Sequence, residues 1–143
     1  MEVVRQFIST VYVLKEDKVL LTWNKVVKIW VPVGGHIDEN ELPCNSVIRE
    51  AKEESGLDIE LFNPYQDKES SNLPQPVHMH LDHIRDDHEH INLIYFGRVI
   101  GGELLDESDE QTPIRFFNHD ELEALELVPN IKEWAIEILK WGK

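Results

Sequence analysis

Three glutamates in one short segment are the residues of this sequence best placed to do chemistry. Glu50, Glu53 and Glu54 all belong to the segment REAKEESG, Arg49 to Gly56. Because an α-helix has 3.6 residues per turn, side chains at positions i, i+3 and i+4 share one face. Like charges at that spacing destabilise an isolated helix by about 0.2–0.5 kcal/mol per pair. The cluster therefore indicates either a bound cation or a solvated acidic face.

A divalent cation would explain why these acids are gathered. Hard cations such as Mg²⁺ and Mn²⁺ prefer oxygen ligands, and they can neutralise the negative charge of a phosphorylated ligand and orient a water molecule. Gly34 and Gly35 precede the segment, and a glycine lets a backbone carbonyl approach a metal that a side chain would obstruct. For the helix considered alone the alternative is a solvated face, with Arg49 and Lys52 softening the repulsion.

The elements that must position the glutamates follow from local signals. A helix is expected from about Pro43 to Ser55, because proline is tolerated in a first helical turn and Gly56 follows where helices stop. Strands are expected at 6–15, 19–23, 30–33, 57–62, 77–84, 90–100 and 114–117, and further helices at 119–127 and 130–141. Interleaved strands and helices predict one domain, residues 1–143, with a mixed sheet flanked by helices.

The expected helix divides into two faces at 100° per residue. With Glu50 at zero, Glu53 and Glu54 fall about 60° to one side and about 40° to the other. A stripe of small and apolar residues falls between roughly 100° and 160° and is expected to pack on the sheet: Cys44, Ile48, Ala51 and Ser55. The carboxylates are therefore expected on an accessible neighbouring face, and Cys44 is expected to be buried.

Composition limits the partners. The net charge is -14, from 28 acids against 14 Lys and Arg, which argues against a nucleic-acid polymer because phosphate backbones are bound by basic surfaces. A small phosphorylated ligand remains compatible if a metal supplies positive charge. The single cysteine fits a reducing compartment, the N-terminus lacks the pattern of a signal peptide, and no apolar run reaches the length of a membrane span. A cytoplasmic protein without a membrane partner is expected.

The residues before the helix complete a longer pattern. Gly35 is followed after five residues by Glu41, after seven more by Arg49-Glu50-Ala51, and then by Glu53-Glu54 and Gly56-Leu57. This pattern resembles the signature of the Nudix hydrolases, GX5EX7REUXEEXGU with U aliphatic, and every charged and glycine position matches. Ala51 is smaller than the usual Ile, Leu or Val, which affects packing and not chemistry. The sequence IWVPVGGHID, residues 29–38, also looks like the family's approach to this motif.

The resemblance implies a Nudix-type α/β/α sandwich with a central mixed β-sheet. It also implies Mg²⁺-dependent hydrolysis, with Mn²⁺ as a substitute, of the pyrophosphate linkage in a nucleoside diphosphate joined to another moiety. Nucleoside triphosphates, ADP-ribose, dinucleoside polyphosphates and nucleotide sugars all remain open as substrates. The alternative is a non-catalytic module of the same fold that senses a nucleotide or ADP-ribose, although such a protein is expected to have lost glutamates of the motif.

The resemblance further implies roles for individual residues. Glu50 and Glu54 are expected to be direct metal ligands, together with the main-chain carbonyl of Gly34. Glu53 is expected to be a ligand or the base that activates water. Arg49 is expected to orient a glutamate through a salt bridge.

Two details of these roles stay open. Glu41 is the candidate partner of Arg49. In several family members the base lies in a loop outside the motif, and the candidates in this sequence are Glu107, Asp109 and Glu110.

Other residues give weaker signals. In the run HMHLDHIRDDHEH, residues 78–90, His78 and His80 share one strand face, as do His88 and His90. These histidines could bind zinc, line the substrate site or face solvent, but no cysteine assists a zinc site and zinc ligands usually come as spaced pairs from two elements. Trp30, just before the glycines, is expected either to stack on a nucleobase or to be buried in the core.

The C-terminal segment carries an apolar stripe at helical spacing. Its members are Ile131, Trp134, Ala135, Ile138 and Trp141. Such a stripe predicts either a core-facing helix or a contact in a homodimer, rather than a membrane anchor.

Overall fold

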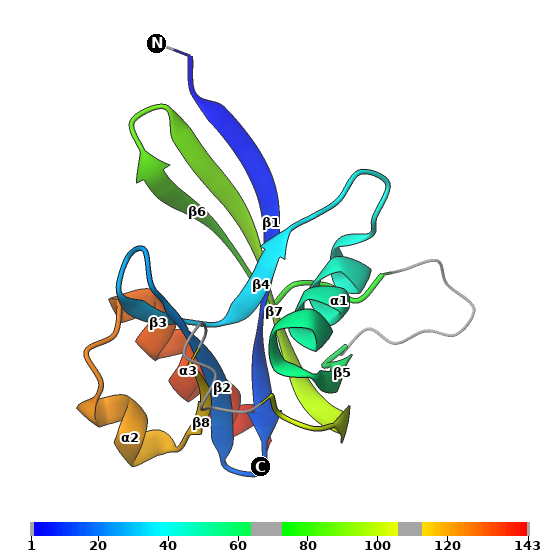
Figure 1. Ribbon diagram of the computed structural model, residues 1–143, viewed down its shortest axis with the longest axis vertical. Coiled ribbons are helices and arrows are strands. Elements are labelled where there is room, and N and C mark those ends of the chain that lie inside the picture. The colour runs from blue at the N-terminus through cyan, green and yellow to red at the C-terminus, as the bar shows by residue number, and fades with distance from the viewer. Residues whose placement is uncertain (1, 64–72, 106–112, 143) are drawn as a thin grey trace.

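A mixed sheet with helices on both faces positions the glutamates (Figure 1). The computed structural model describes residues 2–63, 73–105 and 113–142. The strands are β1 (Val4–Lys15), β2 (Lys18–Asn24), β3 (Ile29–Val31), β4 (Val33–His36), β5 (Leu57–Leu61), β6 (His78–Arg85), β7 (His88–Gly102) and β8 (Ile114–Phe117). The helices are α1 (Pro43–Ser55), α2 (His119–Ala124) and α3 (Pro129–Trp141). Among the described residues no helix is both long and apolar enough to cross a membrane.

β1 and β7 form the parallel centre of a sheet whose other described pairings are antiparallel. Each of the two central strands shares its outer edge between two partners. β1 pairs with β4 along residues 8–11 and with β2 at residues 14–15. β7 pairs with β6 along its first half and with β5 along its second. The sheet therefore has different outer strands at the two ends of its central pair. At one end, β4 places Gly34 and Gly35 beside the part of β1 that faces α1.

Alternate side chains of β1 enter two separate cores. Val11 and Val13 pack in the core beneath α1, whereas Tyr12 and Leu14 pack in the core beneath α2 and α3. This is the period of two expected when both faces of a strand are covered. Figure 1 shows α1 on one side of the central strands and α2 and α3 on the other. The predicted α/β/α sandwich is confirmed.

Helix α1 has the predicted bounds, and Cys44, Ala51 and Ser55 of the expected stripe are buried as predicted. It begins with Pro43 in its first turn and ends before Gly56, whose φ of 80° is left-handed and whose N–H donates to the carbonyl of Lys52. Val47 is completely buried, whereas Ile48, expected in the stripe, is only partly buried. Val47 lies about 20° from Glu54 around the helix axis. The sheet-facing side is therefore nearer to Glu54 than the projection predicted.

The C-terminal stripe is part of the core. Ala135 and Ile138 of α3 are fully buried, and Ile131 and Trp134 pack beside them. Trp141 is 40% exposed. Its ring nevertheless contacts the rings of Phe62 and Phe96. The core-facing interpretation of α3 is thus confirmed, while the homodimer stays a prediction.

The helix expected at 119–127 is shorter in the structure. α2 begins with a capping box between Asn118 and Glu121 and ends at Ala124. The chain then becomes extended at Leu125, and Leu125 and Leu127 pack against the core beneath α3. Burial of these leucines outweighs the local helical preference.

Candidate active site

β4 and α1 approach each other closely at the two glycines. The N–H of Gly34 donates to Oε2 of Glu54 at 3.4 Å. A Cβ added to Gly35 would lie 2.9 Å from the carboxyl carbon of Glu50, and one added to Gly34 would lie 2.2 Å from the carbonyl oxygen of Ser9. Glycine is therefore required at Gly34 by the backbone of β1, and at Gly35 it leaves room for the glutamate side chain.

Arg49 is the centre of a network of acidic side chains. Its guanidinium donates to both carboxylate oxygens of Glu41, at 2.7 and 3.0 Å. Its Nη1 also lies 3.2 Å from carboxylate oxygens of Glu50 and of Glu53, and its Nη2 lies 3.4 Å from Asp38. The hydrogen bond from Arg49 is the main cause that lowers the pKa of Glu41 to about 2. The expected pair of Arg49 with Glu41 is present in the structure.

The three glutamates differ in their exposure to solvent. The side chain of Glu53 is 59% exposed, and that of Glu50 is 18% exposed. Glu54 is partly buried, and burial, with smaller contributions from the charges of Glu50 and Glu53, raises its pKa to about 7. The hydrogen bond from the N–H of Gly34 opposes this shift. In the metal-free protein Glu54 is therefore partly protonated at neutral pH.

This shift predicts a pH dependence of stability. Glu54 has an ordinary pKa of 4.5 and a pKa of about 7 in the folded protein, so between these values the folded state binds more protons than the unfolded state. With EDTA present to remove metal, the contribution of Glu54 to the free energy of unfolding should be complete below about pH 4.5. This contribution should fall as the pH rises to about 7. Glu54→Gln should remove this decline, so its stability relative to the parent should grow by on the order of 1–3 kcal/mol between pH 5 and pH 8.

Urea titrations of both proteins at several pH values measure this difference. Glu60→Gln is the matched control, because Glu60 is an exposed strand residue whose partner, Arg98, lies outside the site. A stability difference between Glu54→Gln and the parent that does not vary with pH would contradict the burial of this carboxyl.

The chemistry of the donor atoms fits a hard divalent cation. Carboxylates of Glu50, Glu53 and Glu54 and the carbonyl of Gly34 supply oxygen only, as Mg²⁺ and Mn²⁺ prefer. In the part of the chain that the structure describes, no three His, Cys, Asp or Glu side chains are already arranged around one point that could hold a metal ion. The three carboxylates do not converge on one point because Glu50 and Glu53 contact Arg49, whereas Glu54 contacts the N–H of Gly34.

A cavity of about 740 Å³ opens beside the two glycines. It is bounded by β4, by the β6–β7 hairpin and by the start of α3. Its lining includes apolar side chains, among them Val27, Ile29, Ile131 and Trp134, and polar ones, among them Thr10, His80, Asp82 and Asn92. Its volume lies in the range typical of small-ligand sites.

Of the three residues expected to line the substrate site, only His80 reaches this cavity. His78 instead stacks on Trp134, with ring centroids 4.9 Å apart, and its Nε2 lies 2.7 Å from a carboxylate oxygen of Glu137. Trp30 packs edge-on against Trp23 and Phe117 and borders a separate cavity of about 450 Å³. The structure therefore favours packing over base stacking for Trp30.

His88 and His90 of the run form a ring cluster with His36 of β4, without the arrangement of a metal site. His90 lies edge-on to both His36 and His88, with centroids 5.1 and 4.8 Å apart. Burial, followed by the neighbouring charges of His36 and His88, lowers the pKa of His90. No metal-holding group is found among the described histidines, so the zinc interpretation gains no support.

Sequence reasoning missed Asp82, Asn92 and Thr10 as residues of the cavity. The signal for Asp82 was present, because it continues the alternation of His78 and His80 along β6. Asn92 and Thr10 lie inside apolar strands, and the sequence around a single polar residue does not show which side chains it will contact. The candidate bases Glu107, Asp109 and Glu110 lie outside the described residues.

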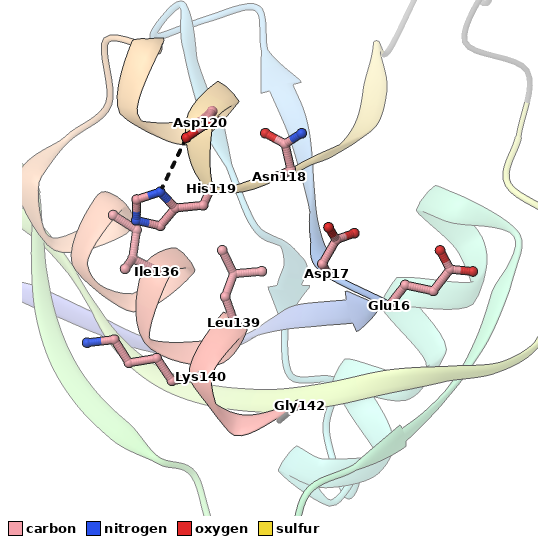
Figure 2. A pocket seen from close by; sticks show the side chains of 9 residues that line it. All are labelled: Glu16, Asp17, Asn118, His119, Asp120, Ile136, Leu139, Lys140 and Gly142. Atoms are coloured by element: carbon pink, nitrogen blue, oxygen red, sulfur yellow. Dashed lines mark ion pairs between the residues drawn. The ribbon is translucent and has the colours of Figure 1, made fainter.

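A further cavity, of about 460 Å³, lies away from the glutamates (Figure 2). Figure 2 shows Glu16 and Asp17 on the turn after β1, His119 and Asp120 at the start of α2, and Leu139 on α3. No residue of α1 or β4 lines it. It therefore has no part in the site around the three glutamates.

Comparison with known proteins agrees with this geometry. A family model described as the NUDIX domain matches residues 5–142. A crystal structure of a NUDIX-family hydrolase from Clostridium perfringens is 32% identical in sequence, covers 99% of this chain and 100% of its own, and has a TM-score of 0.85. No curated protein matches the sequence significantly.

More distant structures share the fold. An ADP-ribose pyrophosphatase from Streptococcus suis is 24% identical, with a TM-score of 0.61, over 96% of this chain and 92% of its own. A MutT NUDIX hydrolase from Burkholderia pseudomallei is 18% identical, with a TM-score of 0.69, over 94% of this chain and 97% of its own. At these identities the likeness shows the architecture alone.

Proposed function

Because the chain belongs to the Nudix hydrolase family, we propose that it hydrolyses the pyrophosphate linkage of a nucleoside diphosphate joined to another moiety, with Mg²⁺ or Mn²⁺ as its cofactor. The observation that carries this proposal is the assembly of Glu50 and Glu54 against the two glycines of β4, which themselves line a cavity large enough for a small ligand. An ADP-ribose pyrophosphatase and a UDP-X diphosphatase are among the proteins that share the fold, and both names describe linkages of this class.

Glu50, Glu54 and the carbonyl of Gly34 are the groups that would hold the cation. When bound, the cation supplies positive charge to the diphosphate and lowers the pKa of an attacking water. The cluster carries a high local negative charge, and the formal charge of the whole chain is -14, so a cation is needed before an anionic substrate can approach. The partly protonated Glu54 would lose its proton on binding a cation.

Arg49 and Glu53 have supporting roles. Arg49 fixes Glu41 with two hydrogen bonds and holds Glu50 and Glu53 beside the site. Glu53 is the most exposed of the three glutamates, so it can reach solvent either as a further ligand or as the base that takes a proton from water. The candidate bases at 107–110 remain alternatives.

The sensor alternative explains the fold but not the retained acids. A protein that only binds a nucleotide does not require three carboxylates on one helical face, whose repulsion costs about 0.2–0.5 kcal/mol per pair in a helix. Here all three are present, with Arg49 and Glu41 beside them. The proposed partner is thus a small nucleotide-type substrate. The proposed location of the protein is the cytoplasm.

A substrate panel tests the proposal. The protein should cleave at least one compound among nucleoside triphosphates, ADP-ribose, nucleotide sugars and dinucleoside polyphosphates when Mg²⁺ or Mn²⁺ is present, and EDTA should abolish turnover. In the same samples Mg²⁺ at 100 times its dissociation constant should stabilise the fold by about 2.7 kcal/mol, measured by thermal melting. Tight binding of one compound without turnover under any divalent metal would reject the enzymatic function in favour of a sensor. A melting shift with Zn²⁺ but not with Mg²⁺ or Mn²⁺ would move the metal site to the histidines.

A further inference from the structure

A chain of hydrogen bonds fixes one carboxylate in the wall of the 740 Å³ cavity. Thr10 donates from its hydroxyl to the side-chain oxygen of Asn92 at 3.1 Å, and the side-chain nitrogen of Asn92 donates to Oδ2 of Asp82 at 3.1 Å. The other oxygen of Asp82, Oδ1, lies 2.6 Å from Nδ1 of His80. Thr10 and Asn92 are each only 9% exposed, so Asp82 is held from within the sheet.

This arrangement determines which atoms are available to a ligand. A carboxylate oxygen only accepts hydrogen bonds, so Nδ1 of His80 carries the proton in its contact with Asp82. A carboxylate can accept about four hydrogen bonds, and Asp82 uses one on each oxygen. The side chains of His80 and Asp82 are 41% and 29% exposed. Both side chains line the cavity, so the carboxylate of Asp82 presents its remaining acceptor positions to a ligand there.

The charge of the cavity also favours hydroxyl groups of a ligand over anionic groups. Among the described residues that line it there is no Lys or Arg, and Asp82 is its one carboxylate. The negative charge of Asp82 adds to the effect of burial in raising the pKa of Tyr12, another lining residue, so this charge acts inside the cavity. A second anionic group on a ligand would be repelled here, whereas hydroxyl groups would find acceptors.

We infer that Asp82, oriented by His80 and Asn92, selects substrates whose moiety beyond the diphosphate is an uncharged sugar with vicinal hydroxyl groups. Two adjacent hydroxyls match the paired oxygens of the carboxylate, and the aliphatic side chains of Val27, Ile29 and Ile131, which also line the cavity, can cover the C–H face of a sugar ring. The inference rests on the proposed function, which puts the diphosphate at the glutamates, because the two glycines next to the glutamates also line this cavity.

Matched sugar nucleotides test this selectivity. UDP-glucose and UDP-glucuronate differ only in a hydroxymethyl group against a carboxylate, and ADP-ribose differs from its 1″-phosphate only in one phosphate. In at least one pair the neutral compound should be preferred by about tenfold or more in kcat/KM. Asp82→Asn should lower kcat/KM for the neutral compound by about tenfold, through KM rather than kcat, and reduce its preference over the anionic one.

Asp86→Asn is the matched control. Asp86 belongs to the same hairpin, is 90% exposed and does not line the cavity, so this variant should leave both the rates and the preference unchanged. A thermal melt of each variant separates loss of fold from loss of selectivity. Should Asp82→Asn fail to fold, the preference of the parent protein still tests the inference.

Calorimetric binding of the same pairs, with Ca²⁺ replacing Mg²⁺ to slow turnover, distinguishes this inference from the proposed function. Cleavage of triphosphates without binding of either sugar nucleotide would overturn the selectivity for sugars and leave the hydrolase standing. Equal binding of neutral and anionic partners would also overturn it. Selective binding of the neutral compounds without any cleavage would support the cavity's specificity and reject the proposed hydrolysis.

Discussion

Glu54→Gln should retain the fold and lower kcat by at least about a hundredfold. The amide keeps the shape of the side chain and one oxygen, but it removes the negative charge that a divalent cation requires. Loss of that charge weakens both metal binding and the stabilisation of the charge that develops during attack. Turnover of parent and variant should be compared at saturating Mg²⁺ on whichever compound the panel identifies, with melting temperatures recorded on the same samples.

Glu60→Gln provides the control for this substitution, since it makes the same chemical change on the exposed side of β5, 54% exposed and paired with Arg98. It should leave kcat within about twofold, because exposed ion pairs contribute little. Near-normal turnover of Glu54→Gln would remove Glu54 from the metal site. A loss that excess Mg²⁺ fully restores would assign Glu54 to metal affinity alone.

Gly34→Ala should destabilise the protein by about 2–4 kcal/mol and abolish most activity. Its added Cβ would lie 2.2 Å from the carbonyl oxygen of Ser9, and this carbonyl belongs to the central strand β1, which cannot move without breaking its pairing with β7. β4 would have to shift away from β1, which would disturb the hydrogen bond from Gly34 to Glu54. Urea unfolding at constant pH in EDTA measures the loss of stability without a contribution from metal.

Gly101→Ala is the appropriate comparison, because its added Cβ would meet only the end of the flexible Asp58 side chain, at 3.3 Å. This variant should lose less than about 1 kcal/mol. If both alanine variants were equally stable, the close approach of β4 to β1 would not be the reason for glycine at position 34.

The bounds of α1 were predictable because its signals are local. Pro43 and Gly56 mark its ends, and the structure places both where helix termini favour them. Its orientation on the sheet was less predictable, since Val47 and Glu54 occupy similar angles and only tertiary packing decides how deeply that side is buried. The partial burial of Glu54, and hence its raised pKa, follows from this packing.

The sheet around the site depended on contacts between distant segments. Residues 30–33 were expected to form a short extended piece broken by Pro32 and by the two glycines. The structure does divide the region at Pro32, into β3, which pairs with β2, and β4, which pairs with β1, but β4 continues through both glycines. Proline cannot donate a ladder hydrogen bond, so it suits the point where partners change. Likewise Asp82 joins Asn92 and Thr10 only because β6, β7 and β1 lie side by side.

The most direct test of the central proposal is hydrolysis in ¹⁸O-water, with the products analysed by mass spectrometry. Hydrolysis of a pyrophosphate linkage predicts two phosphorylated products, with the label in only one of them, because the attacking water bonds to a single phosphorus. The reaction should require Mg²⁺ or Mn²⁺, and Glu54→Gln should slow it by the same factor as kcat. Labelled inorganic phosphate released from phosphate monoesters, with pyrophosphate linkages left intact, would contradict the account.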